Sequence, residues 1–301
     1  MNNGYSVIWT EYVRWLDTLG FSNGLIYDYK GRVKDFIEWL ELQQINHIKT
    51  LTQKHIHAYN EHLQSRQNKR RKGGLGTSHL NHNFMALDKF CEFLHQIGMD
   101  TAPIPINLRI KTDKNERIYK IETLSKEEIK TLQDSIINTY ERLTFIEREA
   151  KQEQLKLVFA LFYGCGIRRT EGANLQIDDI DFEKKTIFIR QGKNYKDRII
   201  PMSTGVYKAL ENYIYNFRNS KKLKHKRLFI HSIGTVSDSL KELQNTCENE
   251  TIKSKRITLH ILRHSIATHL LQNGMSIENI ALFLGHSSLE STQIYTHLIE
   301  Q

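Results

Sequence analysis

Apolar side chains recur with a helical period in four stretches of the first hundred residues. The stretches contain Ile8, Tyr12, Trp15, Leu16 and Leu19; Ile26, Tyr29, Val33, Phe36, Ile37 and Leu40; Ile56, Tyr59 and Leu63; and Leu80, Phe84, Leu87, Cys91, Leu94 and Ile97. Each group would lie on one face of an α-helix. Residues suited to helix ends separate the groups, among them Gly20, Ser22 and Thr52. The pattern predicts a small all-helical domain at residues 1–101.

The composition changes at residues 102–122. Two of the three prolines of the chain lie here, and the charged run at residues 111–117 follows them. Prolines and clustered charges are typical of a segment that connects domains. Ser125 and Glu128 then form a capping box, which marks the start of a helix. We therefore expect a linker, followed by a second domain at residues 123–301.

Patterning in this second domain predicts more helices and one small β-hairpin. Residues 155–162 are apolar on almost every side, as in a buried helix. Residues 206–217 and 236–247 have helical spacing. The strand pattern at residues 186–190 returns at residues 197–201 after a turn, which indicates a hairpin. The expected fold class is mainly α, in two domains, with a small β-sheet or hairpin.

Capping and turn residues divide residues 258–297 into three short helices. Thr258 caps the first helix, and Gly285 ends the second. Ser287 and Glu290 form a capping box for the third. The unit presents four polar side chains, the last of them on the third helix: His260, Arg263, His286 and Tyr295.

These four side chains suit attack on a phosphodiester. A tyrosine hydroxyl has a pKa of about 10, so its use as a nucleophile requires a nearby base or a positive field. The planar guanidinium of arginine matches two phosphate oxygens at once. Negative charge gathers on the non-bridging oxygens during the attack, and preorganised cations can stabilise that charge without a metal ion.

The charge of the chain favours a polyanionic partner. Lysine and arginine number 43 against 34 aspartates and glutamates, a formal net charge of +9, and the pI is about 9.3. This excess favours nucleic acid over a membrane surface. The longest apolar run, residues 157–163, is far shorter than the roughly 20 residues that span a bilayer. A polar N-terminus without a signal peptide and an odd number of dispersed cysteines predict a soluble, cytoplasmic protein.

Two basic runs each allow two interpretations. Four cations lie between the third and fourth predicted helices: Lys69, Arg70, Arg71 and Lys72. They either contact DNA phosphates, with release of counterions, or belong to a solvated connection. The second basic run, residues 218–227, is likewise either a DNA-facing patch or a solvated loop. Histidines are frequent at residues 55–82, but no cysteine pairs or recurrent ligand spacing accompany them, so we predict no metal site.

Two motifs in the last helices resemble those of the tyrosine recombinases, the phage-integrase family. The run from His260 to His264, followed by Ala-Thr-His-Leu-Leu, is similar to the second signature of that family. Leu-Gly-His at residues 284–286 precedes Tyr295 by nine residues, counted from the histidine, as in the family. The resemblance implies that four residues are catalytic: His260, Arg263, His286 and Tyr295.

Two further motifs extend the resemblance. Residues 167–171 look like the first signature, which makes Arg168 catalytic, and Glu171 would orient it. Arg169 and Gly172 depart from the aliphatic residues that are usual there. The hairpin is similar to the family's Gly-Lys-x-x-Lys-x-Arg-x-x-Pro element, which makes Lys193 the catalytic lysine in the turn. Two other cations of this hairpin would hold the DNA backbone: Lys196 and Arg198.

The resemblance implies a site-specific recombinase of double-stranded DNA. An N-terminal helical core-binding domain and a C-terminal catalytic domain would clamp the duplex. Tyr295 would attack a phosphodiester, form a 3′-phosphotyrosyl bond and release a 5′-hydroxyl. His260 would exchange the tyrosine proton, and Lys193 would protonate the leaving oxygen. No metal, ATP or other cofactor is expected, and four protomers would assemble on two DNA sites.

Two other functions remain open on the sequence. A type IB-like topoisomerase would use similar chemistry but rejoin the same strand as a monomer. A DNA-binding regulator would bind without cutting. The recombinase-type signatures and six intact catalytic positions favour recombination over both.

Overall fold

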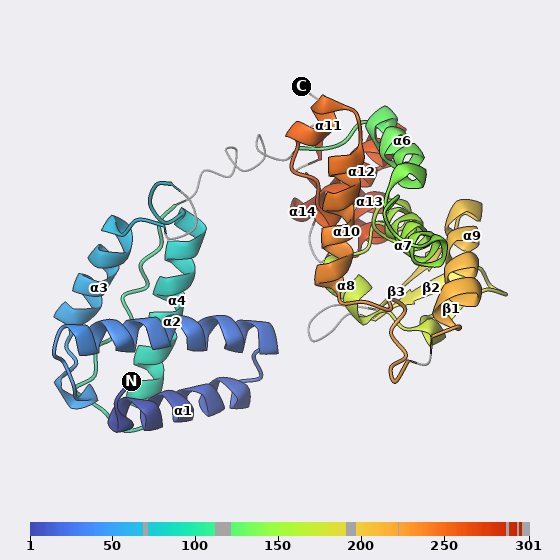
Figure 1. The fold of residues 1–301 in the computed structure, drawn as a ribbon. Coiled ribbons are helices and arrows are strands. Elements are labelled where there is room, and N and C mark those ends of the chain that lie inside the picture. Colours follow the sequence, from blue (N-terminus) through green and yellow to red (C-terminus); the bar gives the residue numbers. More distant parts are fainter. Residues whose placement is uncertain are drawn as a thin grey trace. The chain divides into compact units, whose positions relative to one another are not determined.

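The computed structural model describes residues 1–68, 72–111, 122–190, 197–221, 223–286, 289–293 and 295–296. The chain divides into two compact units, Met1–Asp113 and Lys114–Gln301 (Figure 1). Helices dominate both units, and the second also contains a small antiparallel sheet. The predicted fold class, mainly α with a small sheet, is confirmed. Within the described ranges no helix is long and apolar enough to cross a lipid bilayer.

Four long helices build the first unit, as the sequence predicts. They are α1 (Asn3–Thr18), α2 (Asn23–Leu42), α3 (Gln53–Ser65) and α4 (Thr77–Gln96), with a 3₁₀ turn, η1 (Ile48–Thr50), before α3. The Ser22 hydroxyl accepts a hydrogen bond from the N–H of Leu25 at 3.3 Å and so caps α2. Gly20 has a positive φ of 73° just after α1. The predicted helix ends are thus confirmed at these positions.

Aromatic side chains fill the core of the first unit, where α4 packs against the other three long helices. The rings of Tyr12 and Phe90 meet edge to face, with centroids 5.3 Å apart. The ring centroids of Phe36 and Tyr59 lie 4.9 Å apart. Edge-to-face and tilted ring pairs add to the free energy that burial of apolar area already supplies.

The chain after α4 stays attached to that helix. The buried carboxylate of Asp88 accepts a hydrogen bond from the N–H of Ile106 at 2.9 Å and forms an ion pair with Arg109 at 3.1 Å. The Asn81 side chain bonds both main-chain groups of Ile110, at 2.8 and 2.9 Å. The first half of the predicted linker therefore packs along α4, because the buried Asp88 and the half-buried Asn81 of that helix hold its backbone.

The second unit consists of short helices around a small sheet (Figure 1). The elements are α6 (Lys126–Asp134), η2 (Ser135–Asn138), α7 (Phe145–Val158), η3 (Phe159–Gly164), α8 (Arg169–Asn174), η4 (Ile177–Asp179), β1 (Ile180–Asp181), β2 (Thr186–Ile189), β3 (Arg198–Pro201), α9 (Thr204–Asn212), η5 (Tyr213–Arg218), α10 (Ile233–Thr246), α11 (Glu250–Ser254), α12 (Leu259–Gln272), α13 (Ile277–Leu284) and α14 (Glu290–Gln293).

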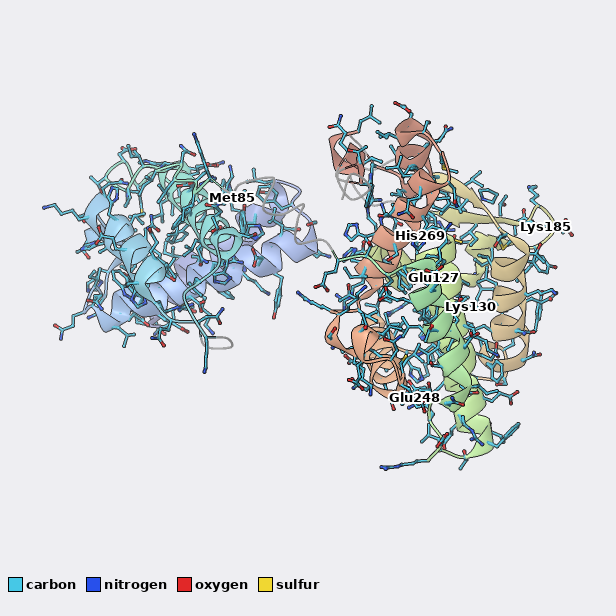
Figure 2. All side chains as sticks on the ribbon, turned by 90° about the horizontal axis from the view of Figure 1, so that it is seen from above. Met85, Glu127, Lys130, Lys185, Glu248 and His269 are labelled. Atoms are coloured by element: carbon cyan, nitrogen blue, oxygen red, sulfur yellow. The ribbon has the colours of Figure 1, made fainter. Side chains whose placement is uncertain are left out.

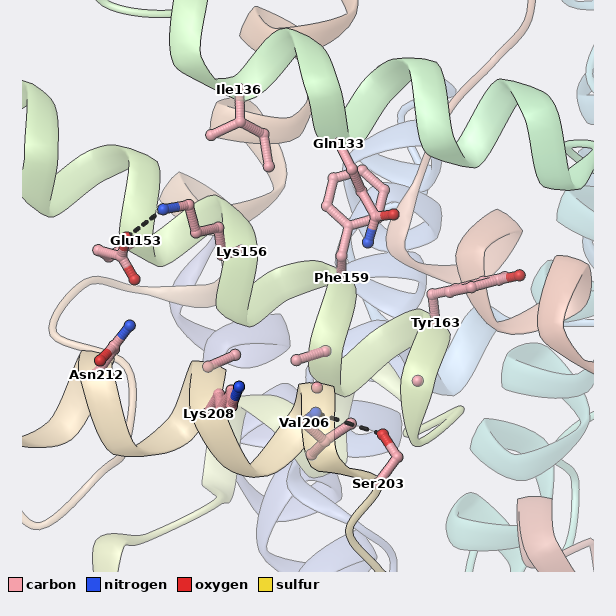
Figure 3. Close-up of a pocket in the computed structure, with 14 residues that line it drawn as sticks. Gln133, Ile136, Glu153, Lys156, Phe159, Tyr163, Ser203, Val206, Lys208 and Asn212 are labelled. Carbon is pink, nitrogen blue, oxygen red and sulfur yellow. Dashed lines mark hydrogen bonds and ion pairs between the residues drawn. The ribbon is translucent and has the colours of Figure 1, made fainter.

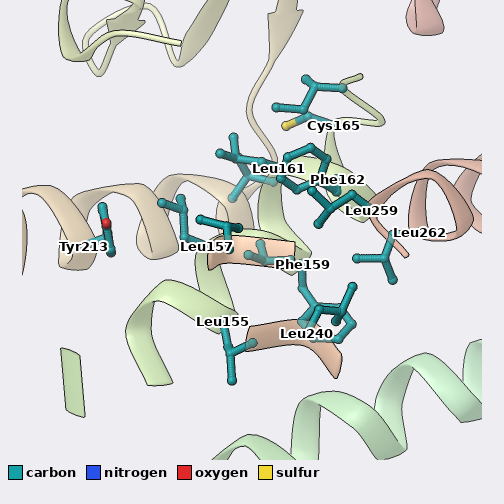
Figure 4. Packing of buried hydrophobic residues seen from close by; sticks show 14 of the residues in the cluster. Leu155, Leu157, Phe159, Leu161, Phe162, Cys165, Tyr213, Leu240, Leu259 and Leu262 are labelled. Carbon is teal, nitrogen blue, oxygen red and sulfur yellow. The ribbon is translucent and has the colours of Figure 1, made fainter. Parts of the chain in front are cut away.

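The core of this unit forms around α7 and the π-helical turn η3 that continues it (Figure 4). Segment η3 packs against α12, α9 and α8. The predicted helix at residues 155–162 is buried as expected, but its second half is π-helical. A Cβ atom at Gly172 would lie 2.5 Å from Cζ of Phe162. Phe162 therefore occupies the space that an aliphatic side chain at this position would need.

The sheet confirms the predicted hairpin and adds one strand. Strands β2 and β3 pair in antiparallel fashion, with Ile187 opposite Ile200 and Ile189 opposite Arg198. The three isoleucines are buried, at no more than 1% exposure. Strand β1 pairs with β2 on its other edge. It escaped the sequence analysis because two residues are too few to show an alternation.

Local capping in the second unit follows the sequence. The Glu128 carboxylate accepts from the N–H of Ser125 at 2.8 Å, and the Ser125 hydroxyl accepts from the N–H of Glu128 at 3.1 Å. The Thr258 hydroxyl accepts from the N–H of Ile261 at 3.2 Å. Helix α13 ends at Gly285, whose φ is 66°. The predictions at Ser125, Thr258 and Gly285 are confirmed.

Candidate active site

Tyr295 lies just beyond α14 and not within it. Its N–H donates to the carbonyl of Thr292 at 3.0 Å, a bond that spans three residues instead of four. The ring is 1% exposed and packs in a cluster with Ile280, Leu284 and Ala267. Helix α14 is described over Glu290–Gln293, so Tyr295 stands just after the described part of the predicted third helix, with its ring in this cluster. Ser287, the predicted cap, lies outside the described residues.

The hydroxyl of Tyr295 meets a histidine that the sequence analysis left without a role. Oη of Tyr295 lies 3.0 Å from Nδ1 of His264 in α12, and the two rings have centroids 5.7 Å apart. His264 follows Arg263 directly and stands one helical turn after His260. Its position at i+4 on the same helix was a signal that could have identified it.

Protonation of this pair follows from its surroundings. Burial raises the pKa of Tyr295 to about 12, against the opposing charges of Arg263 and Arg168. Burial lowers the pKa of His264 to about 4, and the neighbouring His260 and Arg263 act in the same direction. At neutral pH the phenol is therefore protonated and the imidazole is neutral. A protonated phenol can donate this hydrogen bond to Nδ1 in the tautomer that carries the imidazole proton on Nε2.

His286 follows the left-handed Gly285 and stacks with Tyr295 at a centroid distance of 6.4 Å. Its Nδ1 lies 2.7 Å from the hydroxyl of Thr292, a side chain that is 1% exposed. Burial, followed by the charges of Arg263 and Arg168, lowers the pKa of His286 to about 4. A threonine hydroxyl that donates to Nδ1 keeps the histidine proton on Nε2, where it can donate to an anion.

Arg263 is a buried cation held by backbone carbonyls. Its guanidinium donates to the carbonyl of Gly166 and to that of Leu284 at 2.9 Å. Burial, and then the charge of Arg168, lowers the pKa of Arg263 to about 10, so it stays charged at neutral pH. Gly166 has a φ of 58°, and a Cβ there would lie 2.8 Å from a methyl carbon of Leu284. Glycine is required because the backbone turns left-handed in close contact with α13.

Arg168 stands at the start of α8 and is oriented by Glu171. The guanidinium donates to Glu171 at 2.7 Å and to the carbonyl of Gly285. The N–H of Arg168 also donates to the Glu171 carboxylate, at 2.8 Å. The prediction that a buried Glu171 orients Arg168 is confirmed by these contacts.

Arg198, which the sequence analysis assigned to a contact with the DNA backbone, bonds protein groups in this structure. Its two terminal nitrogens both bond the Glu171 carboxylate at 2.9 Å, and its Nε donates to the carbonyl of Phe283 at 3.2 Å. The side chain is 9% exposed. One N–H of each of its three nitrogens is thus bonded to a protein acceptor, and the contact of Arg198 with DNA stays a prediction.

The cluster carries more positive than negative charge. The guanidinium groups of Arg168, Arg198 and Arg263 surround one carboxylate, that of Glu171. Burial alone would raise the pKa of Glu171, but the hydrogen bonds and charges of the arginines lower it below its ordinary value. An ionised carboxylate cancels only one of the three cations. The remaining field favours an anion beside Tyr295.

His260 opens α12 at the edge of this cluster. Burial lowers its pKa, and Arg263, Arg169 and Arg168 add to the effect. A cavity of about 590 Å³ lies beside it, lined in part by Arg169, Lys241 and Arg256. The cations around this opening extend the positive surface outward from the buried arginines.

Several predicted site residues fall outside the described residues. They are Lys69, Arg70, Arg71, Lys193 and Lys196. Lys72 is described and exposed. An antiparallel bridge joins Gln67 to Gly74, on either side of the basic run. The bridge holds the two ends of the connection between α3 and α4 close together. Lys193 lies in the sequence between β2 and β3, which pair with each other. Arg198, the first residue of β3, bonds Glu171 in the cluster.

The second basic run is at least partly structural. Arg218 is 5% exposed, and its guanidinium donates to the carbonyls of Arg227 at 2.9 Å and His225 at 2.7 Å. Lys226 forms an ion pair with Asp178 at 2.6 Å. Arg218 is therefore a buried structural residue, neither a DNA contact nor part of a solvated loop. For the rest of residues 218–227 both interpretations stay open.

A second cavity lies away from the predicted catalytic residues. It has a volume of about 470 Å³ between α7, η3 and α9, and Tyr163 lines it (Figure 3). The Tyr163 hydroxyl lies 2.9 Å from Nδ1 of His269 on α12, and Figure 2 labels His269 near Glu127 of α6. These contacts fix α12 against its neighbours. Among the described residues no group of His, Cys, Asp or Glu side chains is arranged to hold a metal ion.

Comparison with known proteins agrees with this geometry. The model of the phage integrase family matches residues 122–301. A protein named tyrosine recombinase from Pseudothermotoga lettingae is 29% identical over 282 residues, which cover 93% of this chain and 89% of that protein. Tyrosine recombinase XerA from Pyrococcus horikoshii is 32% identical over 233 residues, covering 76% of this chain and 72% of the relative.

A solved structure supports the fold. The XerH site-specific recombinase bound to a palindromic difH substrate, in a post-cleavage complex, is 19% identical with a TM-score of 0.68. The match covers 91% of this chain and 76% of that one.

Proposed function

The chain belongs to the phage integrase family, and from this premise we propose that it is a tyrosine-type site-specific DNA recombinase. The observation that carries the proposal is the buried hydroxyl of Tyr295 beside a cluster with an excess of guanidinium charge. Such a site suits a nucleophile that attacks an anionic phosphodiester. The relatives named tyrosine recombinase support the same reaction class.

The proposed reaction begins when Oη of Tyr295 attacks phosphorus. The oxygen–phosphorus bond forms as the bond to the 5′-oxygen breaks, which leaves a 3′-phosphotyrosyl bond and a free 5′-hydroxyl. Arg168 and Arg263 would hold the non-bridging oxygens, and His286 would add a donor. The resemblance assigns removal of the Tyr295 proton to His260. Lys193 would protonate the leaving 5′-oxygen. Attack by a 5′-hydroxyl from another duplex then exchanges strands, and no metal ion or other cofactor enters the proposal.

The single experiment that tests this function uses one plasmid with two candidate sites. Recombination yields new restriction fragments that join the two flanks. Relaxation of supercoils without new fragments would instead indicate a topoisomerase, and a mobility shift alone would indicate a regulator.

The excess of basic residues and the buried, unbridged cysteines support a DNA substrate in the cytoplasm.

We also propose that the run from Lys69 to Lys72 contacts DNA phosphates. Replacing its four cations with glutamine is expected to weaken DNA binding and flatten its salt dependence. Each lost phosphate contact lowers the slope of log affinity against log salt by about 0.9. Binding would be titrated at several salt concentrations, with Lys130→Gln, a change at an exposed lysine of α6, as the comparison for one cation elsewhere. An unchanged slope would mean that the run is a solvated connection.

Assembly is proposed to depend on DNA. A homotetramer on two recombination sites would bring four tyrosines together for paired strand exchange. We expect weak self-association without DNA and tetramers on paired sites, measured by light scattering. A stable tetramer in the absence of DNA would contradict this expectation.

A further inference from the structure

The contact between Tyr295 and His264 has a chemical consequence. The 3.0 Å between Oη and Nδ1 is a hydrogen-bond distance. It is the one hydrogen bond recorded for this hydroxyl among the described residues. A general base must reach the proton that it removes, so geometry comes before acidity in choosing it. Within the described part of the chain, His264 meets that requirement.

We propose that His264 is the base that accepts the proton of Tyr295 during DNA cleavage. This inference rests on the proposed function. As the bond from Oη to phosphorus forms, the phenolic proton moves to Nδ1 and His264 becomes an imidazolium. The bond to the 5′-oxygen breaks at the same time, and that oxygen takes its proton from Lys193. In the reverse step the imidazolium returns the proton to Oη as the 5′-hydroxyl attacks.

The charges that face His264 suit this cycle. His260 and Arg263 approach it from α12, and His286 and Tyr295 from the chain after α13. Burial, followed by the charges of His260 and Arg263, lowers the pKa of His264, so the imidazole is neutral at neutral pH and can accept a proton. A bound phosphate would add negative charge and stabilise the imidazolium that forms. The phenol, in turn, becomes far more acidic once its oxygen bonds phosphorus.

His260 is better placed for the phosphate than for the tyrosine. It stands on the first turn of α12, one turn before His264, and its pKa is lowered by burial and by three arginines. No hydrogen bond joins it to Tyr295 among the described contacts. The two histidines thus divide the work: His260 faces the arginines that would bind oxygen atoms, and His264 faces the nucleophile.

A structural role for His264 is the competing explanation, and the test must separate the two. Cleavage of a nicked suicide substrate would be followed in single turnover across pH for wild type and two variants. His264→Ala removes the base, whereas His264→Gln keeps a hydrogen-bond acceptor for Tyr295 but cannot take a proton. Both are expected to cleave about 10²- to 10⁴-fold more slowly at neutral pH. The exposed His231→Ala serves as the matched control.

Two further readouts respond to proton transfer and not to structure. Added imidazole should restore part of the His264→Ala rate. Fluorination of Tyr295, which lowers the pKa of its phenol, should speed cleavage by His264→Ala and change the wild-type rate little. Without a base, the rate should also rise with pH as Tyr295 ionises.

The outcomes are distinguishable. If the wild-type protein forms no covalent adduct, the proposed function fails and the inference falls with it. If the wild type forms the adduct and His264→Gln cleaves at the same rate, only the inference is overturned. A slow His264→Ala that binds DNA normally but ignores imidazole and fluorination would also overturn it, because His264 would then only position Tyr295.

Discussion

Tyr295→Phe is expected to abolish covalent attachment to DNA while leaving DNA affinity unchanged. The substitution removes the one oxygen that would bond phosphorus and keeps a ring that is buried against Ile280 and Leu284. Loss of a nucleophile costs on the order of 10⁴- to 10⁶-fold in rate. A nicked suicide substrate would trap the wild-type adduct, which a denaturing gel separates from free protein.

The matched control is Tyr215→Phe, the same chemical change at a side chain that is 59% exposed. It should trap as much adduct as the wild type. Binding of each variant would be measured by mobility shift, so that a folding defect cannot be mistaken for lost chemistry. An adduct formed by Tyr295→Phe would place the nucleophile on another residue.

Glu171→Gln is expected to produce the largest loss of stability among the site variants. Glu171 and Arg198 have side chains that are 5% and 9% exposed, and Arg168 shares the same carboxylate. Breaking a buried ion pair leaves an uncompensated charge, which costs about 3–5 kcal/mol in the free energy of unfolding. DNA cleavage should fall as well, because Arg168 loses the carboxylate that orients it. Urea denaturation and single-turnover cleavage would measure the two effects.

An exposed ion pair provides the control for this variant. Asp238 and Lys241 lie 2.9 Å apart with side chains that are 70% and 63% exposed. Asp238→Asn should change the free energy of unfolding by only about 0–1 kcal/mol. A loss of similar size in both variants would mean that the buried cluster does not stabilise the unit.

Acidification should reduce the difference between wild type and Glu171→Gln. The arginines hold the pKa of Glu171 below its ordinary value. A carboxylate of this kind stabilises the fold above the pKa of the unfolded chain, about 4.3, and the stabilisation is lost as the pH falls through the lower, folded value. Urea unfolding curves of the wild type and of Glu171→Gln should therefore differ at neutral pH. The two curves should converge as the pH is lowered well below 4.

Much of the local structure was predictable because it depends on neighbours three or four residues away. The capping box of Ser125 and Glu128 and the left-handed Gly285 set helix ends at the predicted places. The periodic apolar positions of the first unit likewise predicted its four long helices. The family resemblance identified Tyr295, and Arg168, Arg263 and His286 lie around it in the structure. The catalytic roles of these residues and of Lys193, and the DNA contacts of Lys69 to Lys72, remain predictions.

Only the tertiary structure decided which side chains meet. Arg198 and Glu171 are 27 residues apart in the chain, and spacing alone could not show that the arginine would bind this carboxylate. His264 and Tyr295 are 31 residues apart. The sequence analysis assigned the tyrosine proton to His260 and left His264, one turn later on the same helix, without a role. The packing of α12 against the chain after α13 brings His264 to its hydroxyl, because contacts between distant segments depend on how helices pack and not on their local spacing.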